Sequence, residues 1–201
     1  MGHLIPTDFH EDYAEFLTPQ ECQEISTIIL NSEQDILNID NHENNDYYSG
    51  TTKQYNVYNW LNHPDFAKYN IHERIFNLPI FANCNSLMVQ CWANVLRFKE
   101  SIKEHVHATA DPASHDVEFY ACNLFISGNT NTTTWYEDTG YTPNTVGTLS
   151  CISPFMLHKV PTHLFSTPRI SIAMDIYINP HTFHMCEQEP NRFTFYERNN
   201  G

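Results

Sequence analysis

The spacing of apolar residues divides the chain into a helical part and a β part. Ile25 and Ile29 lie on one helical face, and Thr18 opens a capping box in front of them, so a helix is predicted over 19–31. A second helix is predicted over 64–76, where apolar residues again recur at helical spacing. Both helices precede the β part of the chain.

From residue 87 onward, apolar and polar residues alternate with the period of two that is typical of strands. Loops rich in glycine, proline, asparagine and aspartate separate these segments. Many short strands after a helical segment indicate a mainly β sandwich or jelly roll supported by N-terminal helices. The predicted strands are 87–98, 105–108, 117–127, 133–136, 148–153, 158–160 and 170–178.

No linker divides the chain, so one domain is predicted over 1–201. Within it, residues 1–80 are expected to form a buttress of helices and loops, and residues 87–178 the β core. A short strand is predicted over 55–60. The segment 38–50 is rich in Asn, Asp and His and is expected to be an exposed connection, with a lid over the β core as the alternative.

The composition is acidic. Lys and Arg total 10 and Asp and Glu total 24, which gives a formal net charge of −14. Such a surface repels phosphate backbones and anionic lipids, so neither nucleic acid nor a membrane is expected as a partner. A local positive pocket for an acidic small molecule is compatible with this charge.

The six cysteines include no Cys-x-x-Cys pair, which argues against a zinc ribbon or a thioredoxin-like motif. No secretory leader is recognised, and no apolar run reaches about 18 residues. We therefore expect a cytoplasmic protein with reduced and mostly buried thiols.

His105 and His107 stand two residues apart in a predicted strand, which places both imidazoles on one face. Two such imidazoles can bind one metal ion, although a His-x-His pair alone is more often two ordinary surface residues. His158 follows an apolar strand and a proline-containing turn, at the rim of the β core. There it would be either a third ligand or a hydrogen-bonded core histidine.

Arg169 begins an otherwise apolar strand and shares a face with Ser171. A guanidinium beside a hydroxyl suits bidentate capture of a carboxylate, whereas a lone Arg at a strand end is more often solvated or paired with an acid. The ordered set of His-x-His, a later His and then Arg-x-Ser combines three metal ligands with a carboxylate anchor. Fe(II) accepts imidazole ligands in a facial arrangement with open positions.

These motifs resemble, in the same order, those of the iron- and 2-oxoglutarate-dependent oxygenase superfamily, and more narrowly a bacterial and phage-type group with a His-x-His segment. The resemblance covers a little under half of the chain, all of it in the β part, and the segment 16–22 also resembles the helix that starts many of these proteins. The matching stretch spans 92–177, and its motifs are 92–107, 123–128, 154–160 and 169–177.

The resemblance implies a double-stranded β-helix, a cupin-like jelly roll, that uses Fe(II), 2-oxoglutarate and O2, with ascorbate as an optional accessory. His105 and His158 would bind the iron. Arg169 would pair with the distal carboxylate of 2-oxoglutarate, with Ser171 assisting and Asn123 projecting inward beside it. The implied dioxygenase reaction converts 2-oxoglutarate to succinate and hydroxylates a substrate, either a small molecule or a protein side chain.

One departure concerns the third ligand, because the usual family motif is His-x-Asp or His-x-Glu and this chain has His107 there. Three outcomes follow. His107 binds the metal itself; Asp111, or less readily Asp116, replaces it; or the site binds metal poorly and activity is lost. The first is favoured because the strand spacing suits it.

Two other functions stay open at this point. A cupin-like oxygenase with three histidines would use oxygen without a keto acid, but it would not need an anchor such as Arg169. A catalytically inactive β-helix that serves as an interaction module would explain the missing acidic ligand. Aromatic residues near the motifs are expected to belong to the core. The sequence indicates neither the substrate, nor the oligomeric state, nor a role for the residues after 178.

Overall fold

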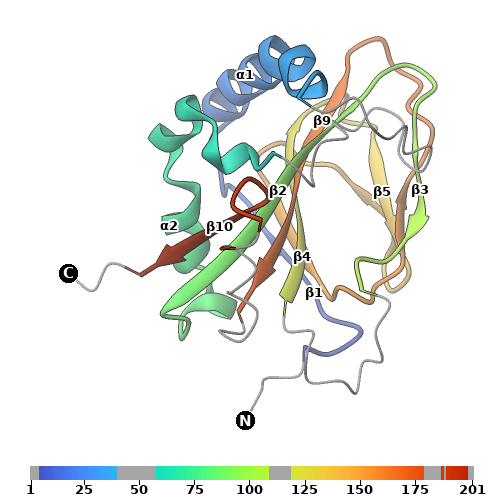
Figure 1. The fold of residues 1–201 in the computed structure, drawn as a ribbon. Coiled ribbons are helices and arrows are strands. Elements are labelled where there is room, and N and C mark those ends of the chain that lie inside the picture. Colours follow the sequence, from blue (N-terminus) through green and yellow to red (C-terminus); the bar gives the residue numbers. More distant parts are fainter. Residues whose placement is uncertain (1–4, 40–57, 109–118, 179–186, 188, 199–201) are drawn as a thin grey trace.

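The structure, a computed structural model, describes residues 5–39, 58–108, 119–178, 187 and 189–198 (Figure 1). The helical elements are α1 (Pro19–Leu37), α2 (Ile71–Phe76) and the 3₁₀ helices η1 (Trp60–Asn62), η2 (Pro64–Tyr69) and η3 (Pro79–Phe81). The strands are β1 (His10–Tyr13), β2 (Ser86–Leu96), β3 (Ile102–His105), β4 (Phe119–Ser127), β5 (Thr133–Tyr136), β6 (Gly140–Pro143), β7 (Leu149–Ile152), β8 (His158–Val160), β9 (Arg169–Tyr177) and β10 (Phe193–Glu197).

The strands form two antiparallel sheets. The larger sheet has the order β1-β7-β4-β9-β2-β10, and the smaller has the order β3-β8-β5-β6. Figure 1 shows α1 and α2 on one side of the larger sheet and the smaller sheet on the other. The predicted class, mainly β with N-terminal helices, is therefore confirmed.

The central strand β9 presents a different chemistry on each face, because successive side chains of a strand point in opposite directions. Ile170, Ile172, Met174 and Ile176 belong to the apolar core under the helices. Ser171, Ala173, Asp175 and Tyr177 instead line a cavity on the other face, toward the smaller sheet. The strand is buried on both sides except at Tyr177, so its polar residues are enclosed as well.

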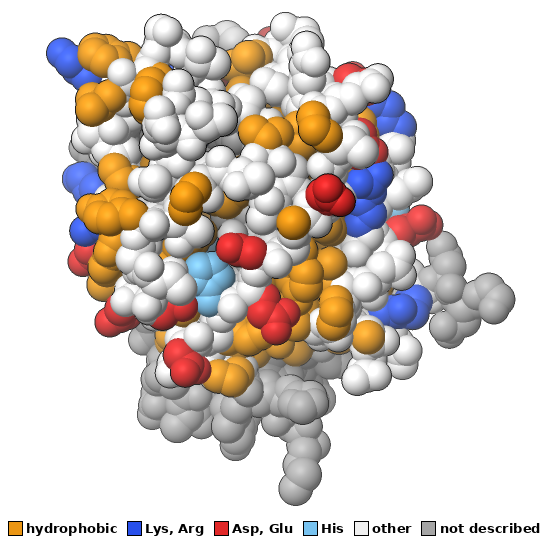
Figure 2. All heavy atoms as spheres, turned by 180° about the vertical axis from the view of Figure 1, so that it is seen from behind, with side chains coloured by type: hydrophobic (Ala, Val, Ile, Leu, Met, Phe, Trp, Pro, Cys, Tyr) orange, Lys and Arg blue, Asp and Glu red, His pale blue; other side chains and the backbone are white. Residues whose placement is uncertain are grey.

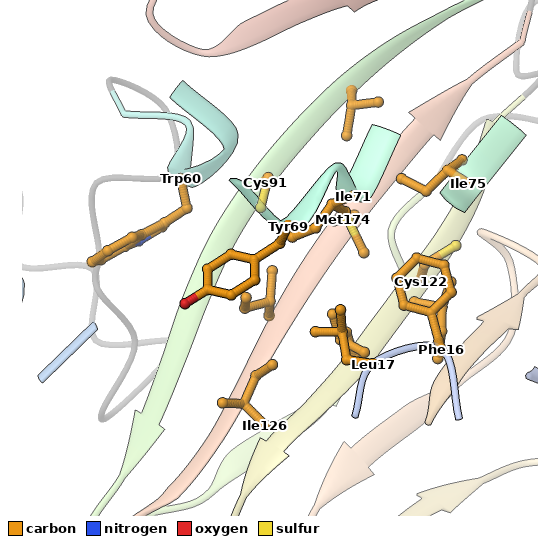
Figure 3. Close-up of a cluster of buried hydrophobic side chains, with 14 of the residues drawn as sticks. Phe16, Leu17, Trp60, Tyr69, Ile71, Ile75, Cys91, Cys122, Ile126 and Met174 are labelled. Carbon is orange, nitrogen blue, oxygen red and sulfur yellow. The ribbon is translucent and has the colours of Figure 1, made fainter. Parts of the chain in front are cut away.

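The main core lies between the helical layer and the larger sheet. Figure 3 shows Trp60, Tyr69 and Ile75 on helical elements that lie in front of the strands carrying Cys91 and Met174. Trp60 and Ile75 are at most 1% exposed. This apolar contact fixes the larger sheet from behind and leaves its opposite face available for polar chemistry.

Helix α1 begins at the capping box expected from the sequence. The Glu21 backbone N–H donates to Thr18 Oγ1 at 3.2 Å, and the Thr18 N–H donates to Glu21 Oε2 at 2.8 Å. Arg74 of α2 donates to Glu21 Oε1 at 2.5 Å and to the Phe16 carbonyl at 2.6 Å, which ties the two helices together. The helix continues six residues beyond the predicted end at residue 31.

The helix predicted over 64–76 is divided in two. Residues Pro64–Tyr69 form the 3₁₀ helix η2, and α2 begins only at Ile71. Asn70 between them has a φ of 49°, the left-handed conformation that interrupts a right-handed helix. The apolar residues recur at the same spacing on both sides of Asn70, so their periodicity does not reveal the break.

Two strand predictions need correction. Residues 105–108 are not a strand, because β3 ends at His105 and His107 lies in the following loop. Half of the strand predicted over 55–60 lies outside the described residues, and its described half forms no strand and leads into the 3₁₀ helix η1. The ladder between β3 and β8 is irregular between Ile102 and His105.

The structure adds three strands that the sequence analysis did not predict. β1 and β10 occupy the two edges of the larger sheet, and β6 occupies an edge of the smaller one. β10 lies in the segment after 178 that had no assignment, and it pairs with β2 over its whole length. The proposed lid, residues 38–50, lies outside the described residues beyond residue 39.

No helix of the described residues is long and apolar enough to cross a membrane. Figure 2 shows acidic side chains across the face opposite to that of Figure 1, with basic side chains mostly toward its margins. This distribution agrees with the formal net charge of −14.

Candidate metal and 2-oxoglutarate site

A cavity of about 310 Å³ opens on the inner face of the larger sheet, toward the smaller one. Its volume is at the lower end of the range for small-molecule sites. Polar side chains from both sheets and from the loop after β3 line it. Those that concern the site are His105, His107, His158, Asn123, Ser171 and Asp175.

Three histidines converge on one wall of this cavity. His105 and His158 are direct cross-strand partners of β3 and β8, and their ring centroids are 4.2 Å apart. The His107 ring lies 5.4 Å from His105 and 5.1 Å from His158. One ligand atom from each histidine lies within 4.8 Å of the others. The predicted pairing of His105 and His107 thus holds in space, although no common strand produces it.

The loop after β3 brings His107 into this group through its backbone. The N–H groups of His107 and Ala108 both donate to the Pro154 carbonyl, at 2.9 and 3.0 Å. The His107 ring also stacks on Trp92 of β2, with a centroid distance of 5.7 Å. Pro154 belongs to the turn before β8, so the same turn positions both His107 and His158.

Hydrogen bonds select one tautomer for each imidazole. His105 Nδ1 lies 2.8 Å from the Lys103 carbonyl, and His158 Nδ1 lies 2.9 Å from the Met156 carbonyl. His107 Nδ1 lies 2.5 Å from Asp175 Oδ1. Each acceptor requires a proton on Nδ1, so a neutral ring carries its lone pair on Nε2. This is the arrangement in which a histidine can bind a metal through Nε2.

Burial keeps two of the imidazoles neutral. It lowers the pKa of His105 to about 4, with the neighbouring His107 adding to the effect. Burial also lowers the pKa of His158 well below its usual value, again with help from the other two histidines. Near neutral pH, protons therefore do not compete with a metal ion for these nitrogens.

Asp175 is a site residue that the sequence analysis missed. It lies on the inner face of β9, is 8% exposed and contacts His107 directly. The signal was present, because a period of two from Arg169 and Ser171 places Asp175 on the same face. It was overlooked because Asp175 lies far along the chain from the histidine motif.

Arg169 is enclosed in the protein with few partners. It is 1% exposed, and its NH1 and NH2 groups donate to Ser171 Oγ at 3.3 Å and Thr134 Oγ1 at 3.1 Å. Its Nε has no hydrogen-bond partner, and no acidic residue of the described chain pairs with it. Burial lowers its pKa to about 10, so the guanidinium is still charged at neutral pH. A buried cation without an acid is costly, which is typical of a site for an anion.

Arg169 borders a second cavity beside the one that holds the histidines. Ser171, Thr134 and Asn123 line the cavity that holds the histidines. Arg169 itself lines a second, adjoining cavity of about 200 Å³, which shares Val160 with the first. The guanidinium therefore lies behind the two hydroxyl groups. The alternative metal ligands Asp111 and Asp116 lie outside the described residues.

Comparison with solved structures finds the same fold in several oxygenases. The carbocyclase SnoK from nogalamycin biosynthesis, described as non-heme and alpha-ketoglutarate-dependent, gives a TM-score of 0.64 at 10% identity, over 94% of this chain and 92% of its own. The viral collagen prolyl hydroxylase of Paramecium bursaria Chlorella virus-1, in complex with 2-oxoglutarate, gives 0.59 at 10% identity, over 84% and 95%. The non-heme monooxygenase ThoJ, in complex with nickel, gives 0.59 at 13% identity, over 86% and 74%.

No protein-family model matches the sequence, and a search of the curated proteins finds no match. At identities of 10–13%, the likeness to these structures concerns the fold. The two facing sheets with helices behind the larger one are thus a double-stranded β-helix, as predicted, and the chain has the jelly-roll fold of the 2-oxoglutarate-dependent oxygenases.

Proposed function

We propose that this protein is an Fe(II)- and 2-oxoglutarate-dependent dioxygenase that hydroxylates a small molecule or a protein side chain. The observation that carries the proposal is the convergence of His105, His107 and His158 on the wall of one cavity. The buried Arg169, which has no acidic partner among the described residues, adds an anion site nearby. The oxygenase fold supports the same reading.

The three imidazoles fit a divalent metal ion. Their ligand atoms lie within 4.8 Å of one another, and each Nδ1 is held by an oxygen acceptor, which leaves the Nε2 lone pair for coordination. Three histidines would occupy part of the coordination sphere and leave positions for further ligands. His107 takes the third position in this proposal, in place of the acidic residue of the usual motif.

Iron and 2-oxoglutarate, when bound, supply the chemistry that converts 2-oxoglutarate and oxygen to succinate and carbon dioxide and hydroxylates a C–H bond. Arg169 binds the distal carboxylate, and the Ser171 and Thr134 hydroxyls position the guanidinium. Asn123 lines the cavity near them. Because Arg169 is 1% exposed, an ion pair with it would form away from bulk solvent and would be strengthened.

Binding of 2-oxoglutarate to the Fe(II)-loaded protein without oxygen tests this proposal. We expect Arg169→Ala to weaken 2-oxoglutarate binding by roughly 2–5 kcal/mol, because it removes one partner of a buried charge pair. Metal affinity should change little, since Arg169 does not contact the histidines. Isothermal titration measures both affinities, and succinate is then measured after oxygen is admitted.

Two variants make this test more specific. Arg169→Lys keeps a buried charge but loses the planar fork, so it should fold where Arg169→Ala fails and should still bind 2-oxoglutarate more weakly. Arg97→Ala removes a surface arginine that pairs with Glu33 and should leave both affinities unchanged. Equal 2-oxoglutarate binding by the wild type and both Arg169 variants would remove Arg169 from the site.

A second candidate is an oxygenase with three histidines that uses no keto acid. The observation that favours it is the composition of the metal-binding group, which contains three histidines and no carboxylate among the described residues. Metal binding without any affinity for 2-oxoglutarate would select this candidate. Arg169 has no acidic partner among the described residues, which favours the first proposal. An oxygenase that uses no keto acid has no carboxylate of a co-substrate for Arg169 to bind.

A further inference from the structure

Asp175 occupies an unusual position for a carboxylate. It lies on the inner face of β9, opposite Ala121 of β4 and Gln90 of β2. The side chains of Asp175 and His107 are 11% and 9% exposed, and the Oδ1–Nδ1 distance is 2.5 Å. Burying a carboxylate is unfavourable unless it is hydrogen-bonded to a strong donor. In the described chain, its only ion-pair partner is His107.

The geometry makes Asp175 a neighbour of the metal-binding group and not a member of it. The group of mutually close ligand atoms contains the three histidines but no atom of Asp175. Asp175 faces Nδ1 of His107, the nitrogen that does not point to the metal when Nε2 coordinates. The direct contact of the carboxylate with the metal-binding group is therefore its contact with the His107 ring.

In the described part of the chain, Nδ1 of His107 has a charged acceptor, the Asp175 carboxylate. The acceptors of His105 and His158 are the backbone carbonyls of Lys103 and Met156. A carboxylate acceptor makes the imidazole a more electron-rich ligand than a carbonyl does, and it fixes the ring more firmly. His107 stands where the usual motif has a carboxylate ligand. Its imidazole is also supported by a carboxylate, that of Asp175.

We propose that Asp175 is a positioning residue of the metal centre, which orients His107 and supplies through its ring the negative charge that a directly bound carboxylate would supply. The inference rests on the metal centre proposed above. The His107 ring is held by the Asp175 carboxylate on one side, by stacking on Trp92 and by the bond of its backbone to Pro154. Of these three contacts, only the carboxylate carries charge.

The test measures the affinity of the metal-free protein for Co²⁺ alone, a probe that reports its ligands through its absorption spectrum. We expect Asp175→Asn, which keeps a hydrogen-bond acceptor but removes the charge, to weaken Co²⁺ binding by about tenfold, and Asp175→Ala by up to about 100-fold. Asp12→Asn is the matched control, because Asp12 also faces a histidine, His10, but lies outside the metal-binding group. It should leave the affinity unchanged.

A double-mutant cycle shows whether the effect passes through the ring. If Asp175 acts through His107, then Asp175→Asn should have no further effect on Co²⁺ affinity in a His107→Gln background. An equal effect of Asp175→Asn in both backgrounds would overturn the proposal, as would wild-type affinity in Asp175→Asn. If the wild type itself binds no Co²⁺, the proposed metal centre fails and this inference fails with it.

A measurement on the metal-free protein tests the contact between Asp175 and His107 even where a variant is too unstable for metal titration. In the metal-free protein, the ¹⁵N shifts of the His107 ring report which nitrogen carries the proton. We expect a proton on Nδ1 in the wild type and in Asp175→Asn, and a shift toward Nε2 in Asp175→Ala, where the acceptor is gone. An Nε2-protonated ring in the wild type would overturn the assignment.

Discussion

The chemistry of individual residues in the cavity depends on burial. His105 and His158 are kept neutral because their charged forms would be poorly solvated and would repel the neighbouring histidines. Arg169 is buried as well, but its high intrinsic pKa keeps it charged even after burial lowers that pKa to about 10. The same environment therefore holds two neutral imidazoles and one permanent cation.

The lowered pKa of His105 predicts how the stability of the metal-free protein depends on pH. The pKa is about 4 in the folded protein and 6.5 for an ordinary histidine, so between these values the unfolded chain binds a proton that the folded chain does not. The contribution of His105 to the free energy of unfolding is therefore fully present above about pH 6.5, and it is lost as the pH drops toward 4. Thermal unfolding in the presence of a chelator, between pH 7.5 and 5, should show this decrease.

The variant His105→Gln provides the comparison. It removes this titration and should make the melting temperature less dependent on pH over the same range, although other groups still contribute. His158 shifts in the same direction, so the dependence should not vanish. A decrease as steep in His105→Gln as in the wild type would show that His105 is already protonated or exposed in the folded state.

At the scale of single residues, the sequence indicates those whose chemical type and order along the chain are characteristic. The three histidines and Arg169 were singled out because their types suit a metal and a carboxylate, and the structure brings the three histidines together. Asp175 was missed because acidic residues are common, and its meaning depends on the His107 contact, which joins residues 68 positions apart in the chain. Contacts of this kind are set by the sheet and not by local spacing.

At the scale of the elements, the turn before β7 fixes the start of α1 on the sheet. Gly147 in this turn has a φ of 84°, and its carbonyl accepts the Leu17 N–H at 3.1 Å. A Cβ at this position would lie 2.2 Å from the Leu17 carbonyl oxygen. Because that atom belongs to the backbone, it cannot move aside as a side chain could.

We expect Gly147→Ala to lower the free energy of unfolding by roughly 1–3 kcal/mol from the left-handed backbone alone, with the clash adding to it. Gly140→Ala is the matched control, since Gly140 has a φ of 74° and nothing within 4 Å of an added Cβ. Urea unfolding of both variants separates the two contributions. Equal losses in the two variants would mean that the turn can move away from Leu17.

Strands were predicted best where they are long and largely apolar, as in β2, β4 and β9, which are buried over most of their length. β1 and β6 were missed because they are short edge strands whose residues are mostly polar and partly exposed. The end of β3 was misplaced for a different reason. His107 is held by the Pro154 carbonyl and the Asp175 carboxylate, neither of which is local to it in sequence.

At the scale of the whole molecule, the larger sheet separates two environments. One face carries the helices and the apolar core, and the other faces the cavity with its histidines and hydroxyls. The helical layer should therefore contribute stability without taking part in metal binding. The cavity residues should affect ligands more than they affect the fold.

A core variant tests this separation. Ile75 of α2 is 0% exposed, and Ile75→Ala should cost about 2–5 kcal/mol in free energy of unfolding, as expected for deleting buried methyl groups. Under conditions where the protein remains folded, its Co²⁺ affinity should equal that of the wild type. Leu30→Ala, at a residue that is 40% exposed, is the control and should change neither quantity appreciably. A marked loss of metal affinity in folded Ile75→Ala would link the two layers.

The class of fold followed from the order of helical and alternating segments, but the order of strands in the sheets did not. The neighbours in the larger sheet are mostly distant in sequence, as when β1 pairs with β7 and β10 with β2. Periodicity indicates which face of a strand is apolar, and it does not indicate which strand lies beside it.

The double character of β9 has an evolutionary consequence. Every second residue of this strand belongs to the cavity and the others belong to the helix-packed core. The gain or loss of one codon in the middle of the strand would exchange the cavity-facing and core-facing residues from that point on. Asp175 would then enter the isoleucine-rich core, or an isoleucine would lie beside His107. The gene segment that encodes β9 can therefore vary by substitution but hardly by length, whereas the loops around the cavity are free of that constraint.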